Sequence, residues 1–334
     1  MAEQGRTMRW QLGAEDLGQR LDQLLTERLE DYSRTAIKRL FTDGRVLLDG
    51  RVAKAGEKPK RPAELCLLEA EGASDRGDEP PVGSELGAEV EALFAQVRVI
   101  YEDEAILVLY KPRGLVVHPA AGHSGDTLVD YLQRNWPGQL SLLGGEDRAG
   151  IVHRIDKDTT GLLLAVKDAR AHQRLAQDLA EHAVQRHYLA LVYGQPDAQK
   201  GCIDAPLARS LKDRKRMCVA AGGREARTHF RLVERLRGMS LLDVELETGR
   251  THQIRCHMEY IRHPLVGDPV YAPGRPNYGL AGQALHAYRL DFCHPLTGEG
   301  LSFRAAAPED FVTVYLRQGG QLRSLNQYWE EHEC

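Results

Sequence analysis

The densest group of reactive side chains in this sequence lies at residues 153–161, which read His-Arg-Ile-Asp-Lys-Asp-Thr-Thr-Gly. Apolar residues flank this stretch on both sides, so we expect a buried strand before it and another after it. A surface hairpin loop that ends in a glycine would explain the pattern. Alternatively, the strands hold Asp156 at the mouth of a cleft, where His153 and Arg154 orient it or bind an anionic substrate.

A second polar stretch covers residues 248–257, which read Thr-Gly-Arg-Thr-His-Gln-Ile-Arg-Cys-His. Apolar residues recur at helical spacing from position 251, which predicts that a helix begins at this turn. A helix N-terminus that carries Arg250, His252 and Arg255 is suited to hold an anion, because its free amide groups and its dipole favour negative charge. A basic cap on an ordinary helix is the alternative.

Two other chemistries fit the reactive residues less well. A glycosidase needs two carboxylates roughly 5 to 10 Å apart, and Asp158, the candidate partner of Asp156, is only two residues away. A metallohydrolase could use His153, Asp156, His252 and His257, but the last two are five residues apart and do not share a helix face. No phosphate-binding glycine loop is present, so a nucleotide cofactor is not implied. We expect an activity that needs neither a cofactor nor a metal.

Length and composition predict a soluble protein of two domains. The chain has 334 residues, of which 42% are hydrophobic, and no run of 18 apolar residues. Its first residues lack the apolar core of a signal peptide, so we expect a cytoplasmic location and no membrane partner. The six cysteines form no C-x-x-C pair, which argues against a zinc site or a disulfide framework.

The formal net charge of -4 conceals two basic blocks. Residues 33–62 hold nine Lys or Arg against three acids, and residues 209–237 hold ten against three. Residues 64–104, in between, hold twelve acids and two basic residues. Two basic blocks separated by an acidic segment can bind a nucleic acid, although either block alone would fit a solvated surface.

The N-terminal part of the sequence predicts a small module at residues 15–70. Apolar spacing indicates helices at residues 17–29 and 33–44, followed by a hairpin with an Asp-Gly turn and a strand at 65–69. Arg34, Lys38 and Arg39 lie on the second helix. This order resembles the α-L RNA-binding module of a small-subunit ribosomal protein, so we expect these cations to bind RNA. Residues 71–90 have the composition of an acidic flexible linker.

Residues 91–325 predict a single larger domain. Its expected strands lie at 97–101, 106–110, 186–193, 228–236, 239–247, 284–292 and 301–303. Helices are expected at 127–132, after Asp168, after Thr251 and from about Pro308. Because most strands connect as hairpins, we expect an α+β domain with a mixed, largely antiparallel sheet.

Four motifs in this domain resemble the RluA/RluD family of RNA pseudouridine synthases. They are the stretch 153–161, the stretch 249–255, Arg-His-Tyr at 186–188 and Lys-Pro-Arg-Gly-Leu at 111–115. The resemblance covers nearly the whole chain and points to the branch that acts on large-subunit ribosomal RNA. The departures are small: Ile155 replaces the usual leucine, and Thr160 stands where serine is commoner.

The resemblance implies an enzyme that isomerises uridine to pseudouridine. It makes Asp156 the nucleophile, and a paired cation should keep that carboxylate ionised by lowering its pKa by about 1 to 3 units. Arg255 is the expected partner and Arg250 the second choice. Tyr188 matches an aromatic residue that stacks on the base.

Further expectations concern the RNA and its surroundings. Arg154 would replace the flipped nucleotide or hold its phosphate, and Lys111, His153 and His252 would assist in RNA binding. The expected partner is a stem-loop of large-subunit ribosomal RNA, within a pre-ribosomal particle, bound by a monomer. A transfer RNA pseudouridine synthase and a non-catalytic RNA-binding or ribosome-assembly factor are the alternatives. Only the non-catalytic factor would be indifferent to loss of Asp156.

Overall fold

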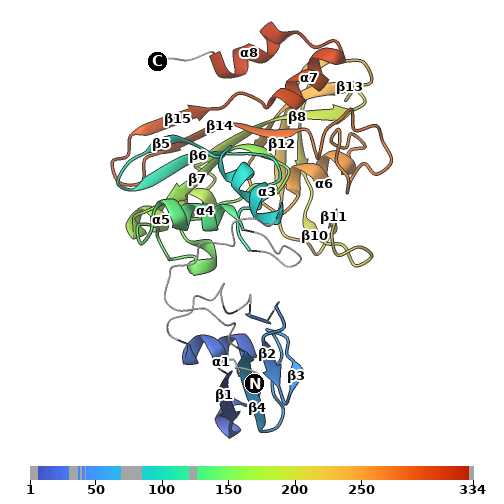
Figure 1. Ribbon diagram of the computed structural model, residues 1–334. Helices are drawn as coiled ribbons and strands as arrows, with labels where there is room; N and C mark the ends of the chain where they lie inside the picture. The colour runs from blue at the N-terminus through green and yellow to red at the C-terminus, as the bar shows by residue number, and fades with distance from the viewer. Residues whose placement is uncertain are drawn as a thin grey trace. The chain divides into compact units, whose positions relative to one another are not determined.

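The computed structural model describes residues 7–29, 37, 40–41, 43–68, 85–119 and 126–330. The chain divides into two compact units, residues 1–82 and residues 83–334 (Figure 1). No helix within these described ranges has the length and apolar character needed to cross a bilayer.

The smaller unit is built on a four-stranded antiparallel sheet in the order β1-β4-β2-β3. Its elements are β1 (Thr7–Leu12), α1 (Leu21–Arg28), β2 (Val46–Leu48), β3 (Arg51–Val52) and β4 (Ala63–Leu68). The predicted hairpin is confirmed, with positive φ angles of 48° at Asp49 and 76° at Gly50, as a tight two-residue turn requires. Strand β1 was not predicted and lies before the expected start of the module, where it pairs with β4 along its whole length.

The larger unit is organised around a nine-stranded sheet. Eight strands follow the order β5-β6-β7-β14-β8-β13-β12-β9, and β15 pairs with β14. Their bounds are β5 (Arg98–Glu102), β6 (Ile106–Lys111), β7 (Thr160–Val166), β8 (Gln185–Tyr193), β9 (Lys200–Asp204), β12 (Arg227–Arg235), β13 (Met239–Leu246), β14 (Leu285–Cys293) and β15 (Gly300–Arg304). Only β7 and β14 pair in parallel among the described strands, so the predicted α+β class with a mixed, largely antiparallel sheet is confirmed.

Helices cover both faces of this sheet. Their bounds are α3 (Glu85–Phe94), α4 (Leu128–Asn135), α5 (Ala169–Ala180), α6 (Gln253–Tyr260), α7 (Glu309–Arg317) and α8 (Leu322–Glu330). Apolar residues of α3, α4 and α6 pack on one face, whereas those of α5, α7 and α8 pack on the other. Figure 1 shows α7 and α8 on the opposite side of the sheet from α3 and α4. Strands β6 and β7 lie between these layers and are buried along their whole length.

The crossing of β7 and β14 explains the glycine that ends the first motif. Gly161 has a φ of +113°, and a Cβ atom there would lie 2.2 Å from the carbonyl oxygen of Ala287 on β14. Only glycine permits this backbone conformation together with so close an approach. The pairing of Thr160 with His286 and of Gly161 with Ala287 therefore fixes the position of the loop before β7.

Three features differ from the expectations. The first flank of the motif is not a strand, because Ile151 forms only one isolated bridge, to Ala165. Helix α3 begins inside the stretch expected to be a linker. Strand β9 and the hairpin of β10 (Leu207–Arg209) and β11 (Met217–Val219) were not predicted, because they are short and have no strict alternation of apolar residues.

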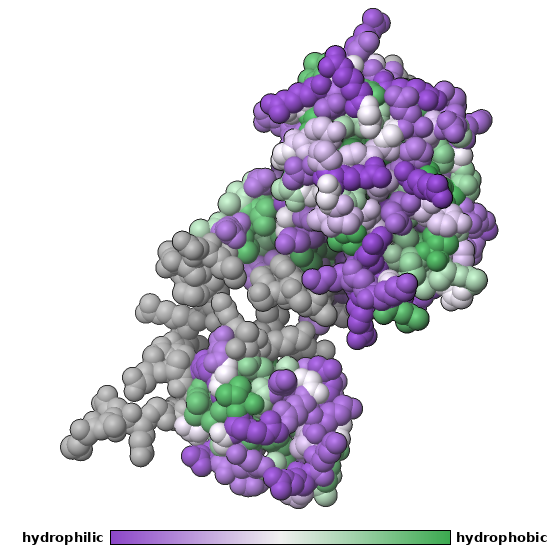
Figure 2. Space-filling model, turned by 90° about the vertical axis from the view of Figure 1, so that its right-hand side faces the viewer, coloured by the Kyte–Doolittle hydropathy of each residue, from purple (hydrophilic) through white to green (hydrophobic). Residues whose placement is uncertain are grey.

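Figure 2 shows hydrophilic side chains over most of the visible face of the larger unit, with hydrophobic ones in small separate groups. The described exposed apolar residues are scattered in the same way over many elements. This face therefore offers polar rather than broad apolar contacts to a partner.

Candidate active site

The two polar motifs meet at one small cavity of about 40 Å³. The loop before β7 supplies one wall, strand β8 another, and the turn that leads into α6 a third. Six residues predicted from the sequence line it: Arg154, Asp156, Tyr188, Arg250, His252 and Arg255. Motifs that are almost 100 residues apart in the chain thus form one site.

Arg255 joins the two motifs through two carboxylates. Its Nη1 donates to Oδ2 of Asp156 at 3.1 Å, which is the ion pair predicted from the sequence. Its Nε and Nη2 donate to the two carboxylate oxygens of Asp268 at 2.7 and 3.0 Å. Asp268 in turn accepts the backbone N–H groups of Val270 and Tyr271. The guanidinium is therefore fixed from behind by a carboxylate that is completely buried, while it presents one edge to Asp156.

The two carboxylates differ in exposure. The Asp268 side chain has no exposed surface, whereas 16% of the Asp156 side chain remains exposed at the cavity. Burial by itself would raise the pKa of Asp156, but the positive charge of Arg255 and its hydrogen bond outweigh this effect. The pKa of Asp156 is therefore lowered, so the site holds an ionised carboxylate that a substrate can reach.

Tyr188 forms the floor of the cavity from strand β8. It is 4% exposed, and burial raises the pKa of its hydroxyl group to about 12. The tyrosine is therefore neutral near pH 7 and can donate a hydrogen bond. His252 lies on the opposite wall as the residue before α6, with a positive φ of 55°, and burial lowers its pKa. Its ring is therefore uncharged at neutral pH.

The turn before α6 is held by Gln253. Its side-chain oxygen accepts the backbone N–H of Arg250 and the hydroxyl of Thr248, and its amide group donates to Arg227 and Thr228 on β12. Because Gln253 and two of these partners, Thr228 and Thr248, are buried, the turn has one defined conformation that directs Arg250 and His252 to the cavity. Arg250 itself is exposed, with its Nε bonded to the carbonyl of Glu225.

The expectation that Lys111 binds RNA is wrong. Lys111 is completely buried, and its ammonium group donates to the carbonyl oxygens of Pro112, Leu115 and Lys157. All three donors are thus occupied within the protein, and burial lowers the pKa of Lys111 to about 7. Lys111 instead holds the loop that carries Asp156. Arg113 supports the same loop by donating to the carbonyl of Asp158.

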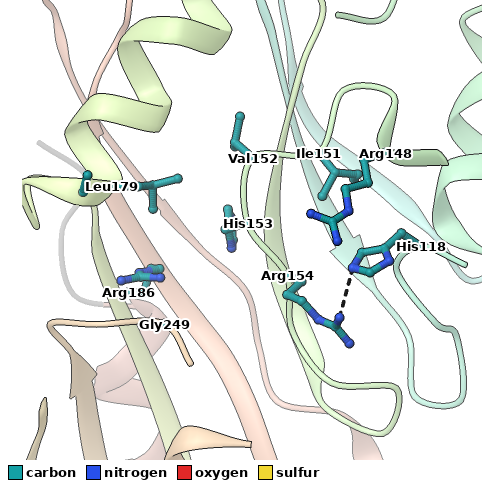
Figure 3. Close-up of a pocket in the computed structure, with 10 residues that line it drawn as sticks. His118, Arg148, Ile151, Val152, His153, Arg154, Leu179, Arg186 and Gly249 are labelled. Carbon is teal, nitrogen blue, oxygen red and sulfur yellow. Dashed lines mark hydrogen bonds between the residues drawn. The ribbon is translucent and has the colours of Figure 1, made fainter. Parts of the chain in front are cut away.

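A second and larger cavity of about 300 Å³ adjoins the first (Figure 3). Arg154 lines both cavities, and its Nη1 donates to Nε2 of His118 at 3.0 Å. His153 lines only the larger one. Its Nε2 accepts the backbone N–H of Leu164, and burial lowers its pKa to about 3, so the ring is neutral. Of the two residues that precede Asp156 in the motif, Arg154 thus lies at both cavities and His153 at the larger one alone.

The number of cations in the two basic blocks does not show which of them are free to bind RNA. Arg34, Lys38 and Arg39 lie outside the described residues. In the second block, Arg227 and Arg231 form ion pairs with carboxylates of neighbouring strands. Four exposed cations of this block lie on the hairpin of β10 and β11 and its loop: Arg209, Lys212, Arg214 and Lys215. Arg224, Arg235 and Arg237 are also exposed but lie outside this hairpin.

Sequence reasoning missed several residues that position the site. Asp268, Gln253 and Arg186 contribute hydrogen bonds or line a cavity, yet none stood out. Asp268 lies in a turn-rich segment, where an acidic residue is ordinary, and nothing in its spacing relates it to Arg255. Arg186 belongs to the motif at 186–188, but the role that the resemblance implies for this motif concerns Tyr188.

The geometry also bears on the rival chemistries. Asp158 does not line the cavity of Asp156, and the described residues that line it include no second carboxylate for a glycosidase reaction. His257 is turned to Thr228 and Ala205, away from the cavity. Among the residues that the structure describes, no three His, Cys, Asp or Glu side chains form a group that could hold a metal ion.

Comparisons with known proteins agree with this arrangement. Residues 105–260 match the family model described as RNA pseudouridylate synthase. An uncharacterized RNA pseudouridine synthase of Bacillus subtilis is 42% identical over 308 residues, which cover 92% of this chain and 97% of that protein. The ribosomal large subunit pseudouridine synthase D of Escherichia coli K12 is 40% identical over 334 residues, covering 95% of this chain and 94% of that protein.

Solved structures show the same fold at lower sequence identity. Human RNA pseudouridylate synthase domain containing 1 has a TM-score of 0.54 and 22% identity, and covers 72% of this chain and 96% of that one. Human RNA pseudouridylate synthase domain containing 4 has a TM-score of 0.53 and 21% identity, and covers 70% of this chain and 97% of that one. The fold and the site thus define an enzyme that modifies RNA. The chain belongs to the RNA pseudouridylate synthase family.

Proposed function

We propose that this enzyme isomerises specific uridines of large-subunit ribosomal RNA, with Asp156 as the nucleophile. The ionised carboxylate of Asp156, paired with Arg255 and still accessible, is the observation that carries the proposal. The choice of RNA is supported by the name of the Escherichia coli relative, which covers 95% of this chain.

The reaction requires little more than such a carboxylate. The N1–C1′ bond of uridine breaks, the uracil turns, and C5 forms the new bond to C1′. In the net balance C5 loses a proton and N1 gains one, so no oxidant, reductant or energy source is needed. Asp156 can support this rearrangement by attacking the ribose or the base ring. Arg255 keeps the carboxylate ionised before the attack and holds its orientation.

The remaining residues receive roles that fit their positions. The uridine must leave the RNA stack to reach Asp156, since its reacting atoms are inaccessible within a helix. Tyr188 stacks on the flipped base, and its neutral hydroxyl group donates a hydrogen bond or a proton. Arg154 is exposed beside the cavity and occupies the gap that the nucleotide leaves, while Arg250 and His252 contact the substrate from the other wall.

The N-terminal unit extends the RNA contact. We assign residues 15–70 to RNA binding through phosphates, with Arg34, Lys38 and Arg39 as contacts, and residues 91–325 to catalysis. Residues 71–90 connect the two parts. The enzyme acts as a cytoplasmic monomer on a stem-loop, within a pre-ribosomal particle. Binding of this kind weakens steeply as salt rises, because each phosphate contact releases counterions.

Pseudouridine mapping of ribosomal RNA tests the proposal. Cells would carry the wild-type protein, no protein, Asp156→Asn or Asp158→Asn. Discrete pseudouridines of the large subunit should disappear in the deletion strain and with Asp156→Asn but persist with Asp158→Asn, which makes the same change two residues away. If the ribosomal map is unchanged throughout, the ribosomal substrate is wrong, and transfer RNA is mapped next. If Asp156→Asn retains every modification, Asp156 is not the nucleophile.

A further inference from the structure

The larger cavity beside the site contains several cations but no carboxylate. We call it the Arg186 pocket and define it by His118, Arg148, His153, Arg154, Arg186 and Gly249, with apolar residues between them. No described Asp or Glu lines it. Figure 3 shows Arg148, Arg154 and His118 gathered on one side of the view and Arg186 on the other, with His153 between them. Three guanidinium groups therefore face one space of about 300 Å³.

Two buried donors in this pocket have no partner in the described part of the chain. Nε of Arg186 and Nδ1 of His153 are both buried and make no hydrogen bond. Arg186 is 93% buried, since its relative exposure is 7%, and its one hydrogen bond to a described residue is a long one of 3.4 Å to the carbonyl of Glu247. His153 uses Nε2 as an acceptor, so Nδ1 carries the proton and is a donor. Unpaired buried donors of this kind destabilise a protein unless a ligand satisfies them.

The backbone makes room for the guanidinium of Arg186. A Cβ atom at position 249 would lie 2.6 Å from Nη1 of Arg186, so glycine is the residue that allows Arg186 to lie here. His118 completes the wall: Arg154 can only donate, hence Nε2 of His118 accepts and its Nδ1 donates to the carbonyl of Pro119. The ring is thus neutral and directs Arg154 along the border between the two cavities.

The Arg186 pocket lies next to the catalytic cavity along strand β8. On β8, Arg186 precedes Tyr188 by two residues, so both side chains face the same side of the sheet, about 6 to 7 Å apart along the strand. The loop before β7 also contributes to both cavities: His153 lines the Arg186 pocket, and Asp156 lines the catalytic cavity. An RNA chain that places one nucleotide in the catalytic cavity can therefore place the adjacent part of its backbone in the Arg186 pocket.

We propose that the Arg186 pocket binds one phosphodiester group of the RNA, adjacent to the uridine that reacts at Asp156. Arg186, Arg148 and the Nδ1–H of His153 are its donors. This assignment rests on the proposed function. A phosphate fits better than a base, because the pocket offers donors without acceptors and no described Phe, Tyr or Trp ring lines it for stacking. Guanidinium groups suit a phosphate well, since their paired N–H groups match its oxygens.

Arg186→Met separates this role from a structural one. Methionine preserves much of the volume and removes an unpaired buried charge, so the melting temperature should stay the same or rise. Affinity for the substrate stem-loop should fall about 10- to 100-fold, as expected for charge-assisted bonds to one phosphate. The slope of log affinity against log salt should decrease by roughly 0.7 to 0.9, the value of one released contact. Arg317→Met, an exposed arginine on α7, is the matched control and should change neither quantity.

A series of RNAs with a single neutral methylphosphonate linkage identifies the phosphate. At one position next to the target uridine, the neutral linkage should weaken binding of the wild-type protein but leave binding of Arg186→Met unchanged. If no position shows this coupling, or if Arg186→Met binds as tightly as the wild type, the assignment is wrong. Should Arg186→Met prove unstable, the exposed Arg148→Met must show the coupling at one such position, and its absence overturns the proposal. Wild-type turnover on the unmodified RNA is measured first: its absence would refute the proposed function itself.

Discussion

Asp268→Asn should weaken both the stability and the activity of the enzyme, although Asp268 never contacts the substrate cavity directly. The asparagine keeps one oxygen for the backbone N–H groups of Val270 and Tyr271. It replaces the other oxygen, which accepts Nε of Arg255, with an amide group that cannot accept this bond, while the bond from Nη2 to the kept oxygen loses its charge assistance. Arg255 then retains only Asp156 as a counterion.

The magnitude follows from the burial of the pair. Removing one partner of a buried ion pair costs about 3 to 5 kcal/mol, and the remaining bond to Asp156 places this case near the lower end. For a unit of this size, a loss of about 3 kcal/mol lowers the melting temperature by roughly 6 to 12 °C. Arg255 also loses its fixed orientation, which should reduce kcat/KM about 10- to 100-fold, equivalent to one charge-assisted bond.

Asp156→Asn is the matched comparison, because it removes the same charge from the other side of Arg255. The guanidinium keeps both bonds to Asp268, so the free energy of unfolding should change by less than about 1 kcal/mol, while activity is lost. Thermal unfolding followed by circular dichroism gives the stabilities, and release of tritium from RNA labelled at uridine C5 gives the rates. Equal losses of stability in the two variants, or a fully stable and active Asp268→Asn, would refute the division of roles between the two carboxylates.

Three further variants probe the framework of the site. Lys111→Met leaves three buried carbonyls without a donor and should lower the free energy of unfolding by about 3 kcal/mol. It should leave the salt dependence of RNA binding unchanged, and a reduced slope would mean that Lys111 contacts RNA after all. His286→Asn should flatten the loss of stability on acidification. His286 is completely buried and its pKa is lowered to about 4. The unfolded chain therefore binds a proton below about pH 6.5 that the folded protein binds only near pH 4, and about 3 kcal/mol is lost in this window. An equally steep profile in urea titrations of the variant would assign this loss to other groups. Gly161→Ala should lower stability by more than about 3 kcal/mol through its clash with Ala287. Gly300→Ala, with no atom within 4 Å of the added Cβ, should be nearly neutral in the same melting experiment, and similar values for both would contradict the close approach.

The sequence was informative wherever chemistry and local pattern coincide. The resemblance of the motifs implied the pairing of Asp156 with Arg255, since an ionised carboxylate in a partly dry cleft needs a nearby cation, and the contact of 3.1 Å between them confirms it. The turn before α6 was also predictable, since the spacing of apolar residues changes there. Both predictions rest on residue types and spacings that fit few other structures.

Other features depend on distant parts of the chain and leave no local trace. Lys111 was expected to bind RNA because it belongs to a motif that resembles an RNA-modifying family, and only the fold reveals the three carbonyl oxygens around its ammonium group. Asp268 acquires its role from α6, which precedes it by a turn-rich segment. The pairing of β14 with both β7 and β8 likewise follows from long-range topology rather than from propensity.

The order of strands in the sheet has a consequence for how the protein is made. Strands β7 and β8 follow each other in the chain, yet β14 lies between them in the sheet. On a ribosome, the loop of Asp156 and the ring of Tyr188 are synthesised 129 and 97 residues, respectively, before the start of β14, the strand that lies between β7 and β8 and pairs with both. Such non-local pairing is slow to form and cannot be complete until residue 291 has left the exit tunnel. A nascent chain therefore gains an aligned active centre only after β14 has been synthesised.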